Sequence, residues 1–260
     1  MNNTQLLKNA VKRGLKIGYI DLETSPALVW TYSFRDTFIP PSSIEEDFKI
    51  TSVAILVEGE TKVKVFEWGK ERDDKKLLEK FLPLLDGLDI VVAQNGDAFD
   101  IKILKWRASY HKMEPPKNIL SLDTLKLSRQ AFRPSSHKLD YRSQSYGLGG
   151  KLHQDMSDCI AVAKGDRRAQ KIRVEYNVKD VIDLRTIFWR ELNYYKLPVK
   201  MCRDLGIIDP ENKREACPNC KGRSIHKKGK STTKTKSYQD FQCQGCGHWF
   251  QRSLPKKEDT

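Results

Sequence analysis

The sequence predicts an α/β protein in which a mixed sheet flanked by helices is followed by a small metal-binding module. Early apolar runs have the alternation or continuity of strands, and amphipathic helical stretches come between and after them. The last 45 residues differ in character, because they hold cysteines, lysines and glycines but few aliphatic side chains. A length of 260 residues allows one substantial core and one small appended module.

Each predicted element has its own signal in the sequence. Val63 and Val65 alternate with lysines, as on a strand with one buried face, and the run 89–94 is almost wholly apolar, as in a strand buried on both faces. Pro83 is expected to shorten or bend its helix. The stretch 24–49 is irregular, and its aromatic residues and prolines either form a wall of a site or cover an edge of the core. In order, we predict a basic helix or arm at 1–14, strands at 16–23, 50–59 and 61–68, a helix at 73–85, a strand at 89–94, a helix at 101–112, a strand at 118–124, two helices within 125–150 and a long helical stretch at 166–195.

The charge balance indicates a polyanionic partner, with nucleic acid as the first candidate. The net charge is +13 and the isoelectric point is near 9.4. Residues 201–260 carry 13 basic and 7 acidic side chains, and residues 221–236 hold seven basic side chains and no acid. A solvated basic loop is the alternative interpretation of that last run.

We expect an intracellular, cytoplasmic protein without a membrane partner. No run approaches the roughly 20 apolar residues that cross a bilayer, and the first residues, MNNTQLLKNAVKRG, lack the apolar core of a signal peptide. In a reducing compartment, paired cysteines indicate metal binding rather than disulfides.

The stretch Lys16–Ser25, KIGYIDLETS, predicts a central strand that ends in Asp21 and Glu23. Residues two apart on a strand point to the same face, so both carboxylates project together. Two like charges at that separation are costly unless a cation lies between them. The alternative is a strand that simply runs into a turn.

Two further motifs place acidic residues where they could join Asp21 and Glu23 in one site. Asp100 follows the buried strand and begins a helix, where capping is the alternative role, although Asp97 is the better cap candidate. Tyr176 and Asp180 lie four residues apart on a predicted helix, which places both on one face. Such a pair is also unremarkable on a half-buried helix.

Taken in order, these motifs resemble the three exonuclease motifs of the DnaQ-like, RNase H-fold DEDD superfamily, in its tyrosine-bearing DEDDy branch. The resemblance covers roughly residues 15–195 and implies an RNase H-like mixed sheet. Asp123-Thr124-Leu125 and His137-Lys138-Leu139 also look like the stretch between the second and third motifs. The insertion at 24–49 has no counterpart that we can assign.

The resemblance implies that Asp21, Glu23, Asp100 and Asp180 hold two divalent ions, either Mg²⁺ or Mn²⁺, which prefer carboxylate oxygen. Tyr176 would orient the attacking water or help to deprotonate it. The implied substrate is the single-stranded 3′ end of a nucleic acid, released as 5′-nucleotides. Leu22 and Phe99 are candidates to contact the terminal base, with packing in the core as the alternative. The candidates for contact with phosphates are Lys102, Lys105 and Arg107, with a solvated helix face as the alternative.

Four cysteines near the C-terminus form two knuckles, Cys217/Cys220 and Cys243/Cys246, separated by 22 residues. This spacing predicts one structural Zn²⁺ ion held by four thiolates. The segment resembles the zinc ribbons of insertion-sequence transposases. Its basic and aromatic side chains are candidates for holding single-stranded nucleic acid, namely Lys227, Lys228, Lys230 and Trp249.

We therefore predict an RNase H-like α/β exonuclease with a zinc ribbon. The expected activity is divalent-metal-dependent 3′–5′ hydrolysis of phosphodiester bonds by a two-metal mechanism, with DNA favoured. The rivals are a non-catalytic nucleic-acid-binding or recombination-associated protein and an RNase H-fold endonuclease. The predicted parts are an N-terminal arm at 1–14, a DEDDy exonuclease domain at 15–197, a linker at 198–214, a zinc ribbon at 215–254 and a tail at 255–260.

Overall fold

The computed structural model divides into two compact units, one of residues 14–196 and one that joins residues 1–13 to 197–260. The predicted domain boundaries are finer than this division and stay a prediction; the predicted tail and eight of the linker's 17 residues lie outside the described residues. The described residues are 2–33, 35, 38–116, 120–149, 155–205, 207, 217–220, 224–233 and 237–254.

The larger unit is built on a five-stranded mixed sheet, which confirms the predicted fold class. β1 lies at its centre, antiparallel to β4 and parallel to β6. β5 extends the sheet antiparallel to β4, and β7 extends it parallel to β6. The strands, in spatial order, are β5 (Lys64–Glu67), β4 (Ile50–Val57), β1 (Ile17–Thr24), β6 (Ile90–Ala93) and β7 (Leu120–Asp123).

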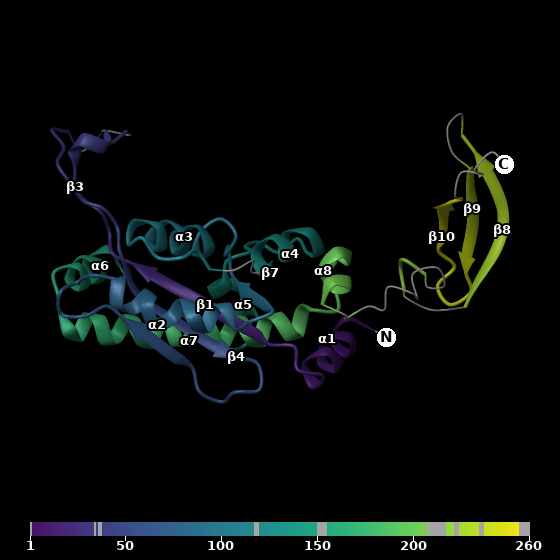
Figure 1. The fold of residues 1–260 in the computed structure, drawn as a ribbon, viewed down its shortest axis with the longest axis horizontal. Coiled ribbons are helices and arrows are strands. Elements are labelled where there is room, and N and C mark those ends of the chain that lie inside the picture. The colour runs from purple at the N-terminus through teal and green to yellow at the C-terminus, as the bar shows by residue number, and fades with distance from the viewer. Residues whose placement is uncertain are drawn as a thin grey trace. The chain divides into compact units, whose positions relative to one another are not determined.

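Helices cover both faces of this sheet (Figure 1). The alternation of β1 decides which side chain meets which helix. Ile20 and Leu22 join a buried apolar cluster with α2 (Lys75–Asp86) and α3 (Asp100–Tyr110). On the other face, Tyr19 meets Phe188 of α7 (Arg167–Glu191) edge to face, with ring centroids 5.9 Å apart.

The remaining helices and strands include elements that the sequence analysis did not predict. The stretch predicted to be irregular contains a two-stranded hairpin of β2 and β3, which we call the β2–β3 arm, with a short 3-10 helix before β3. Pro83 lies inside α2, which nevertheless continues to Asp86. None of the described helices is both long and apolar enough to cross a bilayer. The other elements of this group are α1 (Asn3–Lys12), β2 (Leu28–Val29), η1 (Pro41–Ser43), β3 (Ile44–Glu46), α4 (Thr124–Ala131), α5 (Leu139–Ser145), α6 (Met156–Ala163) and α8 (Val199–Asp204).

The C-terminal module is a three-stranded antiparallel sheet in the order β10-β9-β8. Its bounds are β8 (Ile225–Thr232), β9 (Ser237–Cys243) and β10 (Trp249–Ser253). Phe241 and Phe250 stack with ring centroids 5.4 Å apart, and Arg252 lies over both rings. This small aromatic core leaves Trp249 56% exposed.

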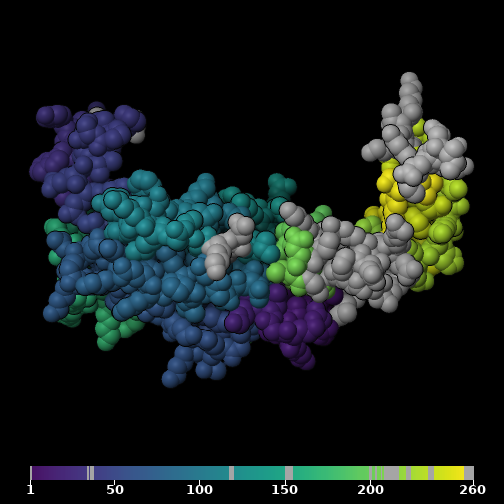
Figure 2. Space-filling view, in the orientation of Figure 1, coloured from purple at the N-terminus to yellow at the C-terminus, as the bar shows by residue number. Residues whose placement is uncertain are grey.

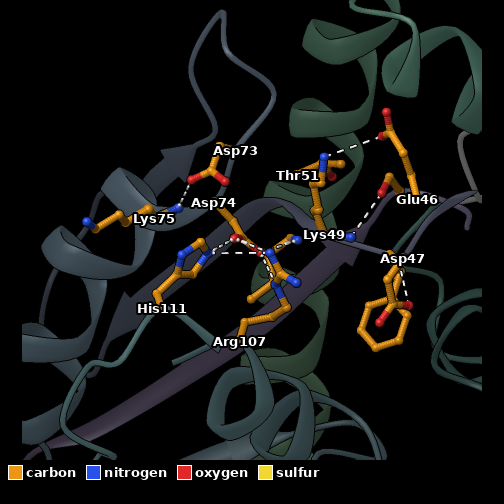
Figure 3. Close-up of polar contacts among 12 residues, drawn as sticks. Glu46, Asp47, Lys49, Thr51, Asp73, Asp74, Lys75, Arg107 and His111 are labelled. Carbon is orange, nitrogen blue, oxygen red and sulfur yellow. Dashed lines mark hydrogen bonds and ion pairs between the residues drawn. The ribbon is translucent and has the colours of Figure 1, made fainter. Parts of the chain in front are cut away.

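A buried ion pair fastens α3 to the start of α2, and it corrects the expectation that Arg107 faces outward. Arg107 is 2% exposed, and it donates to both carboxylate oxygens of Asp74, at 2.7 and 2.9 Å (Figure 3). The Ile50 N–H and the His111 ring complete the carboxylate's partners, at 2.9 and 2.6 Å. Helical periodicity could not reveal this inward charge, because its partner lies 33 residues away in the sequence.

We expect Asp74→Asn to lower the free energy of unfolding by about 3–5 kcal/mol at neutral pH, because it leaves Arg107 buried without a counter-charge. Burial alone would raise the pKa of Asp74, but the hydrogen bonds from Arg107, the Ile50 N–H and His111 hold it below 3.8. This stabilisation is therefore complete above about pH 4 and is lost as the pH falls through the folded-state pKa.

Urea unfolding of the parent and of Asp74→Asn across pH 3–7 checks this expectation. The difference between their free energies of unfolding should become smaller towards pH 3. The matched control is Asp73→Asn, which removes a charge but keeps an oxygen that can accept from the Lys75 N–H (2.8 Å in the parent), and it should cost about 1 kcal/mol or less. Equal losses in the two variants would contradict the assigned role of Asp74.

Candidate active site

The first pair of acids lies at the end of the central strand. Asp21 and Glu23 are both on β1, on the face that α7 covers. Their cross-strand partners on β4 are Ala54 and Ser52. These small neighbours leave room on that face for two carboxylates.

A tight turn brings Asp100 to the same place. Asn95 has φ 64°, a left-handed conformation that asparagine adopts more readily than most residues, and its carbonyl accepts from the Ala98 and Phe99 N–H groups. The chain then enters α3 at Asp100, whose carboxylate accepts from the Leu22 N–H at 3.2 Å. The expectation that Asp97 caps this helix is wrong, because Asp97 pairs with Lys126 at 2.7 Å.

The third motif comes from α7. Tyr176 and Asp180 lie one turn apart, and the tyrosine hydroxyl donates a hydrogen bond to the Asp180 carboxylate. Burial, followed by the nearby Asp180 and Glu23 carboxylates, raises the pKa of Tyr176 above its ordinary value. The hydroxyl is therefore protonated at neutral pH in the absence of bound metal.

The four acids act on one another electrostatically, so the structure brings all of them together. Burial and then the charges of Asp100, Glu23 and Asp180 raise the pKa of Asp21 well above its usual range. Burial likewise raises the pKa of Asp100 to about 7, with Asp123 and Glu23 adding to the effect. Burial and Glu23 raise the pKa of Asp180 to about 7, against the hydrogen bond from Tyr176.

Two residues of α7 that sequence reasoning missed hold the first pair of acids. Asn177 is fully buried and donates to the carboxylate of Asp21 at 2.6 Å and to its carbonyl at 3.0 Å. Arg173 is paired with Glu23 and also donates to the Thr24 carbonyl at 3.2 Å. Their positions, three residues before and one after Tyr176, lie on the same helix face and were the available signal.

The donor set suits hard divalent cations. Neighbouring carboxylates raise the pKa values of Asp21, Asp100 and Asp180, and Mg²⁺ or Mn²⁺ would relieve that repulsion while accepting oxygen ligands. Within the described residues, however, no three of the four carboxylates have oxygens that all lie within 4.8 Å of one another. Glu23 is paired with Arg173.

The predicted substrate contacts fall into two groups. Leu22 is 4% exposed and packs in the apolar core, which corrects its assignment to the terminal base. Phe99 is 42% exposed at the start of α3, and Lys102 and Lys105 are exposed on the same helix. In the C-terminal module, the exposed candidates are Lys227, Lys228, Lys230 and Trp249.

The four paired cysteines form a separate cluster. The Sγ atoms of Cys217, Cys220, Cys243 and Cys246 all lie within 4.8 Å of one another. The Cys217–Cys246 and Cys220–Cys243 Sγ separations are 3.7 and 3.4 Å. Zn–S bonds of about 2.3 Å in a tetrahedron give edges of about 3.8 Å, so the cluster fits one zinc ion. A backbone hydrogen bond from His248 lowers the pKa of Cys246 to about 6, which favours the thiolate.

The mixed sheet, with acids gathered around its central strand, defines the class of protein as one of RNase H-like fold. Residues 37–164 match the family model described as "RNase_T: Exonuclease". This segment is thus similar to DnaQ-like exonuclease domains. Of the five predicted catalytic residues, the matched segment includes Asp100 and leaves out the other four.

One solved structure extends the comparison over most of the chain. It is the family B DNA polymerase from the hyperthermophilic archaeon Pyrobaculum calidifontis, with a TM-score of 0.52 and 13% sequence identity. The similarity covers 87% of this chain and 32% of the polymerase chain. At this identity it shows the fold alone. No curated protein matches the sequence.

We expect Asn177→Leu to reduce nucleic-acid hydrolysis about 10–100-fold, because the carboxylate of Asp21 loses the amide that orients it. Ser52 supports Asn177 by a longer hydrogen bond, in which its hydroxyl donates to the Asn177 side-chain oxygen at 3.3 Å. Ser52→Ala should therefore cost only a few-fold. Single-turnover rates and Mn²⁺ titrations of both variants check this order, and a weaker Mn²⁺ response in Asn177→Leu separates positioning from a general loss of fold.

Proposed function

We propose that this chain is a divalent-metal-dependent 3′–5′ exonuclease that acts on nucleic acid, with DNA favoured. The observation that carries the proposal is the convergence of Asp21, Glu23, Asp100 and Asp180 beside Tyr176, although the four acids come from distant parts of the sequence. The 3′–5′ direction rests on the resemblance of the ordered motifs to the DEDDy exonucleases.

The four carboxylates would hold two metal ions, which when bound supply an activated water and stabilise the leaving oxygen. Within the chain itself, Asn177 orients Asp21, and Arg173 engages Glu23 until a cation competes for that carboxylate. Tyr176 uses its proton in the hydrogen bond to Asp180, so its oxygen remains able to accept from a water. This geometry favours orientation of the nucleophile by Tyr176 over removal of its proton.

We further propose that the zinc ribbon increases the grip on nucleic acid. Lys227, Lys228 and Lys230 are exposed along β8, where pairing with β9 is irregular between Lys227 and Lys230. Trp249 offers an exposed ring on β10. Lysines that contact phosphates and a ring that stacks on bases bind single strands without sequence preference.

The test is hydrolysis of oligonucleotides labelled at the 5′ or the 3′ end, with Mg²⁺ or Mn²⁺. Matched DNA and RNA, single- and double-stranded, identify the substrate. The proposal expects a ladder of single-nucleotide losses from the 3′ end. Internal cuts would favour the endonuclease alternative, and no cleavage under any of these conditions would favour a non-catalytic nucleic-acid-binding protein.

A further inference from the structure

A groove begins beside the acids and runs away from them along the surface of the larger unit. Its first part, of about 550 Å³, starts at Ser25, two residues after Glu23, and lies between the β2–β3 arm and α6. A second hollow of about 370 Å³ adjoins it, because Trp68, Arg72 and Lys164 line both. We call these two hollows together the arm groove.

The end of the arm groove next to the acids is tied to the central strand. Ser25 donates its N–H to the Lys49 carbonyl at 2.8 Å, and its hydroxyl accepts from the Lys49 N–H at 3.0 Å. On the opposite wall, Cys159 of α6 contacts Arg173, the residue that pairs with Glu23. Two residues that line the groove therefore adjoin the acidic site along the chain: Ser25 follows Glu23 by two residues, and Ile160 follows Cys159, which contacts Arg173.

Positive charge dominates the walls of the groove. Of its two acids, Glu46 is paired with Lys49 at 3.4 Å, and Asp166 accepts from two backbone N–H groups as the cap of α7. In the described part of the chain, Lys70, Lys164 and Arg167 form no salt bridge, and all three are exposed. The cations of the groove are Lys49, Lys70, Arg72, Lys164 and Arg167.

Apolar surface accompanies this charge. Leu28, Met156 and Ile160 line the groove and are 51%, 64% and 41% exposed. The β2–β3 arm, which stands out from the larger unit in Figure 2, carries Trp30 and Phe38 at 72% and 75% exposure. Trp30 and Phe38 do not line the groove, but they belong to the arm that forms one of its walls. Apolar surface and exposed rings on that arm suit the bases of a single strand, and the cations suit its phosphates, whereas a purely acidic peptide would use only the cations.

We propose that the arm groove binds single-stranded nucleic acid on the 5′ side of the end being cleaved. The proposal rests on the proposed exonuclease function for its polarity, but the binding itself does not require hydrolysis. In this proposal the β2–β3 arm contributes to substrate binding. The affinity of the protein for an oligonucleotide should then rise with the length of the strand until the groove is filled.

The test compares the full-length protein with the triple variant Lys70→Gln/Lys164→Gln/Arg167→Gln. The matched control, Lys62→Gln/Lys75→Gln/Lys80→Gln, removes three exposed lysines that do not line the groove. Binding of labelled dT20 and dT3 is measured by fluorescence anisotropy with Mg²⁺ and Mn²⁺ omitted. Salt dependence, competition by poly-glutamate and hydrolysis of the same oligonucleotides with metal are measured alongside.

We expect the groove variant to bind dT20 at least about tenfold more weakly than the parent, with the slope of log K against log salt reduced by about 2. Binding and hydrolysis of dT3 should not change, which also shows that the variant is folded. If it is not folded, the double variant Lys70→Gln/Lys164→Gln takes its place, with a slope reduced by about 1.4.

The assignment would be overturned if the groove variant bound dT20 with the affinity and salt slope of the parent. It would also be overturned if the control variant lost as much affinity for dT20 as the groove variant does. Poly-glutamate competing as well as dT20 would overturn the choice of nucleic acid. If the parent binds dT20 through the groove but hydrolyses nothing, the proposed function fails while the groove assignment stands. If it hydrolyses dT20 and the groove variant matches it throughout, only the groove assignment fails.

Discussion

Asp21→Asn and Asp180→Asn are each expected to reduce hydrolysis by roughly 10³-fold or more while leaving nucleic-acid binding intact. Each substitution removes a proposed charged metal ligand from the acidic site, and a metal-held site would contribute several kcal/mol to transition-state stabilisation. Because the acids of the site repel one another, each asparagine variant should also unfold at a slightly higher temperature than the parent when metal is absent.

Two measurements separate this result from a damaged fold. Mn²⁺ should raise the melting temperature of the parent, because a ligand that binds the folded state stabilises it, and this rise should shrink in both variants. Glu79→Gln, on the exposed side of α2, is the matched control and should behave as the parent does. Full activity in either aspartate variant would remove these residues from the catalytic site.

Loss of the zinc ion is expected to unfold the C-terminal module and leave the larger unit folded. Zinc binding to four thiolates contributes about 10–16 kcal/mol in small modules at neutral pH, and this one has little core besides Phe241 and Phe250. Cys217→Ser, at a fully buried ligand position, should therefore bind no zinc and lose amide-exchange protection in β9.

The functional consequence should be confined to the longer substrates. We expect weaker binding of dT20 with a shallower salt dependence, and unchanged hydrolysis of dT3, since residues 14–196 form their own compact unit. The matched control is Cys202→Ala, a buried cysteine outside the cluster, which should retain one zinc per chain. One equivalent of tightly held zinc in Cys217→Ser would falsify the four-thiolate assignment.

Local patterns were sufficient for most of the sheet and for the cysteine cluster. The strand that carries Asp21 and Glu23, the buried run before Asn95 and the long helix carrying Asp180 all appear near their predicted positions. Their signals are alternation, continuous apolarity and helical spacing, which neighbouring residues supply. Short strands and inward charges lacked such signals, as the β2–β3 arm and the wrong outward placement of Arg107 show.

The sequence by itself determined the order of the main elements and the tetrad of cysteines, because each depends on residues close together in the chain. Its proposal of the four acids rests on the resemblance of the ordered motifs to a known family. Only the tertiary structure decided that Asn177 holds Asp21, that Arg173 engages Glu23 and that a cationic groove leads away from both. These contacts join residues about 150 positions apart, and side-chain partners at such separations depend on how helices pack on the sheet rather than on any local pattern.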